Sequence, residues 1–425
     1  MTTPDWPTCT HASGCAAIQR APHTFCLAHL GDADLAAVIE EMTPGDDLDG
    51  RGVTFAHELL RAILAALTSP DTGGAIFGEA RFDQARFPDD TVLDRAQFTG
   101  EASFDGARFA GDASFVTAQF TSDASFSRAQ FTGNVSFTSA AFAGDAAFFD
   151  AQFDGETEFD YARFAGRALF DGAQFAGRTS IGLVHVVGAA QFSGVKFADT
   201  VLFEGAQFAD DVTFTEARFE ARVLGPLVCG GEVNAMGMTV CQPLRLRITA
   251  RQVDLGGARF ESTAVLKLRY ATVNLTDIVA FAPVTVLSYP RSGPYVVSLS
   301  SASPLMISEL PFSDPEEHLG FFGDPRAKVA SIAGADAANL VLNDMDLTRC
   351  VFIGAYHLDQ IRFEGRCTFA TAPRGWALRP QPAAVQALDP SQGPGRRTPV
   401  ACRAPGRTQQ TGARRLGSRP RRQRP

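Results

Sequence analysis

Large apolar residues recur along residues 77–219 at steps that alternate between six and five, so the repeating unit is eleven residues, as in TGEASFDGARF. Of the 27 positions in this register, 24 hold Phe. The other three hold Leu93, Ile181 and Val186. Positions that accept only large apolar side chains are interior positions, so the spacing predicts a continuous core along the whole segment.

A small residue stands two positions before nearly every one of these large residues. It is usually Ala, and Val or Thr replaces it at Val135, Thr157, Thr179, Val201 and Val212. Residues i and i−2 point to the same side of an extended segment, so each short strand is expected to send one large and one small side chain inward. Neither five nor six matches the α-helical period, and sandwich strands are not periodic to the residue, which argues against a helical solenoid and an ordinary sandwich.

The longer of the two steps contains one extra residue, which is often Gly, Asp or Ser. We expect corners that need backbone freedom at these positions. They include Gly100, Gly111, Ser122, Gly133, Gly144, Gly155, Gly166 and Gly177.

This arrangement resembles the pentapeptide-repeat family, whose consensus has Leu or Phe at the centre of each five and a small residue two before it. The resemblance covers residues 77–219 and implies an all-β solenoid, a right-handed quadrilateral parallel β-helix with four short strands per coil. Two eleven-residue units supply the four positions here, which makes the coil longer than the family's twenty, so two of the four corners should be enlarged. At the ~4.8 Å strand spacing, about 6.5 coils give a rod roughly 31 Å long, with Phe stacked on Phe inside it.

The segments on both sides of the repeat are expected to cover or continue it. Apolar residues at helical spacing predict helices over 34–42 and 54–67, with Thr54 as the N-cap of the second, which would cover the open end of the β-helix. After Phe219 the register decays, although strand-like alternation persists in PLRLRITA and TAVLKLRYATVNL. The expected division is a zinc-binding N-terminal module (1–32), an α-helical cap (33–70), the regular repeat (71–219), an irregular continuation (220–287), a loop or insertion (288–335), a second repeat stretch (336–373) and a disordered Arg/Pro-rich tail (374–425).

Three of the eight Cys lie close together near the N-terminus, in the spacing C-x5-C-x10-C-x2-H formed by Cys9, Cys15, Cys26 and His29. Three thiolates and one imidazole suit tetrahedral Zn²⁺, and a short segment with little apolar content needs a metal to fold. We therefore expect a structural zinc site, with His11 and His23 as rival fourth ligands. The alternative is a flexible leader with free surface cysteines.

No motif indicates catalysis. His57-Glu58 begins like a metalloprotease motif, but Arg61 stands where the second His is required. The chain contains no G-x-G-x-x-G, no P-loop and no nucleophile elbow. We expect a protein that is not an enzyme and has no catalytic metal.

Charge is distributed unevenly. The chain has a formal net charge of -9, but residues 374–425 hold twelve Arg and one acid, so residues 1–373 have 26 bases, 46 acids and a net charge of -20. Residues 77–219 alone hold 21 acids and 10 bases, a net charge of -11. Phosphates would be repelled, so the acidic body is not expected to bind nucleic acid directly. The basic tail is either a nucleic-acid-binding arm or an out-of-frame translation of a GC-rich gene.

These features indicate a non-enzymatic scaffold that presents an acidic rod to protein partners, because solenoids offer extended binding surfaces. The family resemblance adds two alternatives. One is a DNA mimic that inhibits or protects a gyrase-type topoisomerase, and the other is the soluble part of a membrane-anchored protein whose C-terminal domain is missing here. The chain has no run of ~18 apolar residues and no signal peptide, so we expect a protein located in the cytoplasm. The family resemblance implies a bacterial source. The partner and the oligomeric state stay open.

Overall fold

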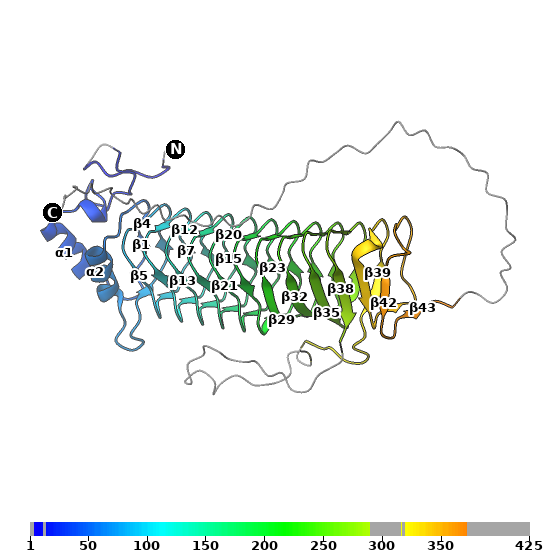
Figure 1. Cartoon of the computed structure of the whole chain (residues 1–425). Coiled ribbons are helices and arrows are strands. Elements are labelled where there is room, and N and C mark those ends of the chain that lie inside the picture. The colour runs from blue at the N-terminus through cyan, green and yellow to red at the C-terminus, as the bar shows by residue number, and fades with distance from the viewer. Residues whose placement is uncertain (1–3, 12–13, 290–315, 317–318, 372–425) are drawn as a thin grey trace, which may run out of the picture. The chain divides into compact units, whose positions relative to one another are not determined.

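The computed structural model describes residues 4–11, 14–289, 316 and 319–371. The chain divides into two units, Met1–Leu378 and Arg379–Pro425, and every described residue belongs to the first. Parallel strands in sheets of 14, 19 and 10 strands wind around this unit as a solenoid (Figure 1). The expected all-β parallel solenoid is therefore confirmed, with two short α-helices near its N-terminus. The predicted disordered tail lies outside the described residues.

Each coil of the regular section has four two-residue strands, as in β3 (Ala80–Arg81), β4 (Arg86–Phe87), β5 (Thr91–Val92) and β6 (Gln97–Phe98). Each strand then pairs in parallel with the strand two repeats later, as Phe98 with Phe120 in β10 (Gln119–Phe120). This register continues to β28 (Arg218–Phe219). The coil length predicted from the spacing, two eleven-residue units, is thus present.

The Phe side chains form the core predicted for them. All 27 register positions are at most 5% exposed. Rings in successive coils stack with centroids 4.6 Å apart for Phe87–Phe109 and up to 5.3 Å apart for Phe197–Phe219. Neighbouring columns meet edge to face, as in Phe104–Phe115 at 87°. Stacked and edge-to-face rings are both favourable arrangements for aromatic pairs, so the interior is a continuous aromatic lattice.

The glycine corners have a different cause from the one expected. Gly100, Gly111 and Gly133 do not have positive φ angles; instead, a Cβ on Gly133 would lie 2.5 Å from Gly111 O of the preceding coil. At these three positions glycine avoids a contact with the preceding coil that a side chain would make. Positive φ angles occur at the other corners, once in every repeat, mostly at non-glycine residues. These are Gln84, Arg95, Gly106, Thr117, Arg128, Ser139, Asp150, Tyr161, Gly172, Leu183, Gly194, Gly205 and Glu216.

Two helices lie at the N-terminal end of the solenoid, α1 (Asp32–Glu40) and α2 (His57–Leu67) (Figure 1). The buried residues Leu60, Ile63 and Leu67 of α2 belong to the same core cluster as the first Phe rings, so α2 covers this end as expected.

The predicted start of α2 is wrong. Thr54 forms a parallel bridge with Arg86, and Phe55 is buried and stacks on Phe87 at 5.3 Å, so both residues precede the helix and extend the core by one position. The N-terminus of the helix is instead satisfied by the next coil, because the Asp89 carboxylate accepts the His57 N–H at 2.9 Å. Nothing in the local sequence 54–67 encodes that contact.

Beyond residue 222 the coil becomes three-sided. Strand β29 (Val223–Cys229) pairs at its start with β25 (Val201–Leu202) and at its end with β26 (Ala206–Phe208), so two faces merge into one. The merged face continues through β32 (Leu244–Thr249) and β35 (Ala264–Arg269), where Leu244 pairs with Ala264, so each coil is shorter than in the regular section. The continuation that the sequence indicated as irregular is a regular coil with one corner fewer.

An insertion separates β38 (Val284–Ser288) from β39 (Lys328–Ser331). Its described part packs outside the solenoid, where Glu316 is buried against Arg269 and accepts a hydrogen bond from Thr249 at 2.9 Å. The solenoid resumes at Lys328, inside the range expected to be loop, and continues through β40 (Leu340–Asn343), β41 (Asp346–Leu347), β42 (Arg362–Glu364) and β43 (Thr368–Phe369).

Candidate metal centre

The N-terminal module, described over residues 4–11 and 14–32, brings its Cys and His residues together through two local structures. An antiparallel bridge between Thr8 and Ile18 closes the loop that carries Cys9 and Cys15, and Cys9 N donates to Ala17 O at 2.7 Å. The 3₁₀ helix η1 (Leu27–His29) has Cys26 as its N-cap residue, so Cys26 and His29 lie one turn apart.

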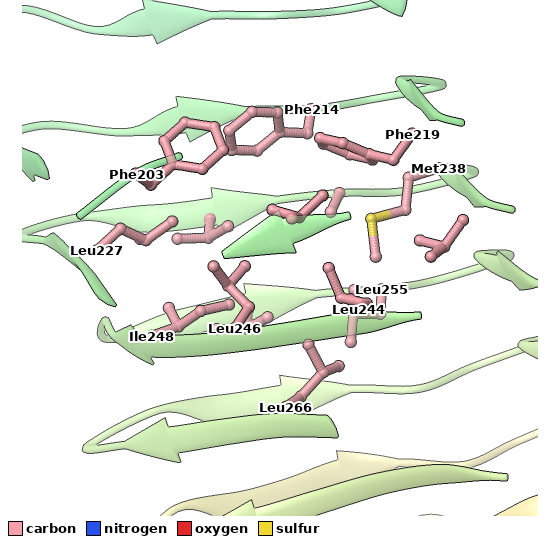
Figure 2. A pocket seen from close by; sticks show the side chains of 15 residues that line it. Phe203, Phe214, Phe219, Leu227, Met238, Leu244, Leu246, Ile248, Leu255 and Leu266 are labelled. Carbon is pink, nitrogen blue, oxygen red and sulfur yellow. The ribbon is translucent and has the colours of Figure 1, made fainter. Parts of the chain in front are cut away.

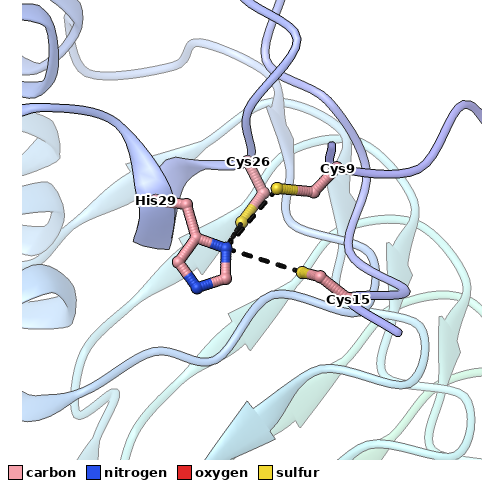
Figure 3. Close-up of side chains that lie close together, drawn as sticks. All are labelled: Cys9, Cys15, Cys26 and His29. Carbon is pink, nitrogen blue, oxygen red and sulfur yellow. Dashed lines mark hydrogen bonds between the residues drawn. The ribbon is translucent and has the colours of Figure 1, made fainter. Parts of the chain in front are cut away.

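The four predicted ligands converge. The Nδ1 atom of His29 lies 3.4 Å from Cys9 Sγ, 3.6 Å from Cys15 Sγ and 3.4 Å from Cys26 Sγ (Figure 3). All four ligand atoms lie within 4.8 Å of one another, and among the described residues they form the one Cys, His, Asp and Glu group close enough to share an ion.

These distances fit a tetrahedral ion better than hydrogen bonds. Sulfur at ~2.3 Å and nitrogen at ~2.0–2.1 Å from tetrahedral Zn²⁺ lie about 3.6 Å from each other, which is the observed separation. A single lone pair on Nδ1 cannot accept three thiol protons together, so three sulfurs around one nitrogen have no simple hydrogen-bonded explanation.

The Cys9 and Cys26 thiols of the cluster differ in protonation. Burial, followed by the charges of Cys15 and Cys9, raises the pKa of the Cys26 thiol to about 12. Burial acts in the same direction on Cys9, but hydrogen bonds from the backbone N–H groups of His11 and Cys26 and from His29 lower its pKa to about 7. Cys26 therefore keeps its proton at neutral pH in the absence of a metal, and a bound cation would have to displace that proton.

The two rival ligands lie outside the cluster. His11 stacks on the His29 ring, with centroids 4.3 Å apart, and His23 Nδ1 lies 3.8 Å from Asp34. Cys9 and Cys26 are buried, which argues against the alternative of free surface cysteines.

The sequence did not indicate how this module contacts the solenoid. Ile18 N donates to Arg51 O at 2.8 Å, and a Cβ on Gly52 would lie 2.8 Å from Ala16 O. The Arg51 guanidinium lies over the Trp6 ring at 5.0 Å. These residues are isolated in the sequence and carry no periodic signal, although Trp6 is one of only two Trp in the chain.

Residues 93–141, within the Phe lattice, match a family model described as pentapeptide repeats (9 copies). The chain is a pentapeptide-repeat protein. A search of curated proteins and a search of solved structures each found no match. In the described part of this pentapeptide-repeat protein, no helix is long and apolar enough to cross a membrane.

Proposed function

We propose that this pentapeptide-repeat protein is a non-catalytic, cytoplasmic scaffold that binds protein partners on the acidic surface of its solenoid. The observation that carries the proposal is the net charge of -11 over residues 77–219, on a rod whose interior is filled with Phe. A rigid charged surface of this kind lowers the entropy cost of binding and steers partners of opposite charge.

The acids have two different roles, which an experiment can separate. Nine Asp side chains in this section accept a backbone N–H from the adjacent coil, as Asp112 does from Asn134 at 2.8 Å, and therefore stabilise the corners. The nine are Asp90, Asp94, Asp105, Asp112, Asp123, Asp145, Asp160, Asp171 and Asp211. Exposed acids such as Asp154, Glu156 and Glu204 make no such contact and are available to a partner.

The test is cross-linking of the full chain to cell extract followed by mass spectrometry. The variant Asp154→Asn/Glu156→Gln/Glu204→Gln should lose the partners that wild type captures while its circular dichroism is unchanged. A matched control, Gln119→Asn/Gln152→Asn/Gln174→Asn, alters three exposed side chains of the rod without changing charge and should keep them. Equal capture by all three proteins would contradict an electrostatic partner surface.

We also propose that Cys9, Cys15, Cys26 and His29 hold one structural Zn²⁺. The separations of 3.4 Å, 3.6 Å and 3.4 Å between His29 Nδ1 and the three sulfurs support it. Purified protein should contain one zinc per chain by elemental analysis, and Co²⁺ substitution should give the absorption of a tetrahedral thiolate complex. Cys26→Ser should lose the metal, whereas Cys350→Ser, outside the cluster, should retain it. Full zinc content in Cys26→Ser would refute this ligand set.

A DNA mimic is the second candidate, and the same charge favours it. A net charge of -11 over roughly 31 Å is about one charge per 3 Å, whereas duplex DNA carries one per ~1.7 Å. Nine of the 21 acids stabilise corners and Asp89 accepts the N–H that begins α2, so ten have a structural role and the scaffold is the better-supported function. Inhibition of gyrase supercoiling by micromolar protein would reverse this order.

A further inference from the structure

A polar cavity of about 250 Å³ lies where the N-terminal module meets the first coils. The module contributes Asp5 and Trp6, the loop before α2 contributes Arg51, and the solenoid contributes the rest of the wall. Asp5 and Trp6 are therefore brought to the cavity by the same segment that carries the Cys/His cluster. The solenoid residues are Glu79, Ala80, Arg81, Asp83, Glu101 and Ser103.

Negative charge exceeds positive charge in this wall, which has four carboxylates and two guanidinium groups. Both guanidinium groups are already engaged. Arg51 makes two hydrogen bonds to Asp49, at 2.9 Å and 2.7 Å, and Arg81 Nε donates to Glu79 at 2.8 Å. An anion would find no available cation here, and the surplus carboxylates would repel it.

Asp83 is the deepest of the remaining carboxylates. Burial raises its pKa, against the opposing hydrogen bond from Ser103 Oγ at 2.9 Å. Asp5 and Glu101 are exposed at the rim. A positive group between the rim and Asp83 would gain charge-assisted hydrogen bonds and compensate a partly desolvated anion.

The size of the cavity limits the ligand. Among the described residues, these carboxylates do not converge closely enough to share a metal ion. A volume of about 250 Å³ is too small for most whole ligands, whose pockets run from about 300 to 1,000 Å³, but it suits one long side chain. Trp6, 9% exposed, is the one large apolar side chain of the wall that the methylene stem of such a side chain would contact.

We propose that this cavity binds the ammonium or guanidinium group of a single Lys or Arg side chain presented by a protein partner. The proposal rests on the proposed scaffold function for the source of that side chain. It adds a defined anchoring point, at the junction of module and coil, to the general attraction of the acidic rod.

The test uses the full chain with Trp376→Phe, which leaves Trp6 as the single tryptophan. The probes are the peptide acetyl-Gly-Lys-Gly-amide, its Arg counterpart and a norleucine counterpart of equal length without charge. Trp6 emission should change on titration with the Lys and Arg peptides and not with the norleucine peptide. Loss of two charge-assisted contacts in Asp5→Asn/Glu101→Gln should weaken binding by about tenfold or more.

The control variant Asp210→Asn/Glu216→Gln removes the same charge from exposed acids elsewhere on the rod, and should change the affinity less than about twofold. Equal weakening in both variants, or no response to the Lys and Arg peptides, would overturn the cavity as a site. Either result would leave capture of partners by the rod unaffected, so the proposal of a binding cavity and the proposal of a scaffold can be refuted separately. Binding of spermidine in preference to both peptides would also overturn a protein side chain as the ligand.

Discussion

Phe148 and Phe149 are adjacent in sequence but lie in different environments, which makes them a matched pair. Phe148 is fully buried, stacks on Phe126 at 5.0 Å and Phe170 at 4.7 Å, and meets Phe137 and Phe159 edge to face at 5.6 Å. Phe149 is 37% exposed. The change to consider is Phe148→Ala, with Phe149→Ala as its control.

The cost of the two changes should differ several-fold. Truncating a buried Phe to Ala costs about 3–5 kcal/mol, because apolar burial is lost and a cavity remains. Four close aromatic partners for Phe148, each contributing about 0.5–1.5 kcal/mol, place its loss near the upper end of that range. The partly exposed Phe149 should cost about 1 kcal/mol or less.

Guanidinium denaturation followed by circular dichroism measures the two losses. Hydrogen exchange complements it, because coils contact mainly their neighbours and a defect should open locally before the whole rod unfolds. Amides of the coils around residues 126–170 should lose protection first in Phe148→Ala. Similar midpoints for the two variants would refute the conclusion that the stacked rings dominate the stability of the coil.

Three further predictions concern single positions. Gly133→Asn should destabilise the protein by about 2 kcal/mol or more, because the new Cβ would overlap the preceding coil. Gly106→Asn should cost less than about 1 kcal/mol, because Gly106 has a φ of +64° and its added Cβ would have its nearest neighbour at 3.7 Å. Equal thermal melting midpoints for the two variants would contradict this account of the corners. Thr157 is 1% exposed and its Oγ1 has no hydrogen-bond partner among the described residues. Thr157→Val should therefore raise the unfolding free energy by about 1 kcal/mol in guanidinium denaturation. The control Thr179→Val breaks a hydrogen bond to Gly177 O at 3.4 Å and should raise the unfolding free energy by less. Burial raises the pKa of Asp83, so the contribution of this carboxyl to stability is complete below the ordinary value of 3.8 and is lost as the pH rises through the folded-state pKa. Asp83→Asn should therefore melt at the same temperature as wild type near pH 3 and at a higher temperature than wild type at pH 7. A constant difference in melting temperature across that range would contradict the raised pKa.

The parts of the fold that the sequence predicts are those encoded in its period. The spacing from Phe98 to Phe120 is itself the coil length, and the Ala two positions earlier marks the inward face, so the register between coils and the ring stacking could be read directly. The four metal ligands could be identified for a similar reason, because few residue types bind zinc and they are sparse in this chain.

The features that could not be predicted depend on contacts between distant segments. The carboxylate that accepts the first N–H of α2 belongs to Asp89, which lies in a later coil. From the local sequence alone Thr54 is the better N-cap, and that choice places Phe55 in the helix instead of the core. The merged face was visible as alternation over Leu244–Thr249, but the decay of the register after Phe219 suggested an irregular continuation of the coil rather than the removal of a side.

The merged face leaves a packing defect at the point where the aromatic lattice ends. An apolar cavity of about 30 Å³ lies beneath Phe214 and Phe219, where Met238 and Leu255 take over from the rings (Figure 2). The flexible Met238 side chain only partly fills the change in cross-section. We expect the interior at this junction to be packed less tightly than the interior of the four-sided or the three-sided coils.

The eleven-residue repeat makes each four-sided coil nearly two-fold symmetric about the rod axis, because its Gly corners and its positive-φ corners each occur twice. Deleting two successive repeats would shorten the rod by one rung and leave every face in phase. Deleting a single repeat would keep the Phe lattice continuous but turn all later coils by half a revolution relative to the N-terminal module. The repeat length therefore sets the rotational phase between the two ends of the protein, and half-coil deletions could place a docking surface on the opposite side without disturbing the core.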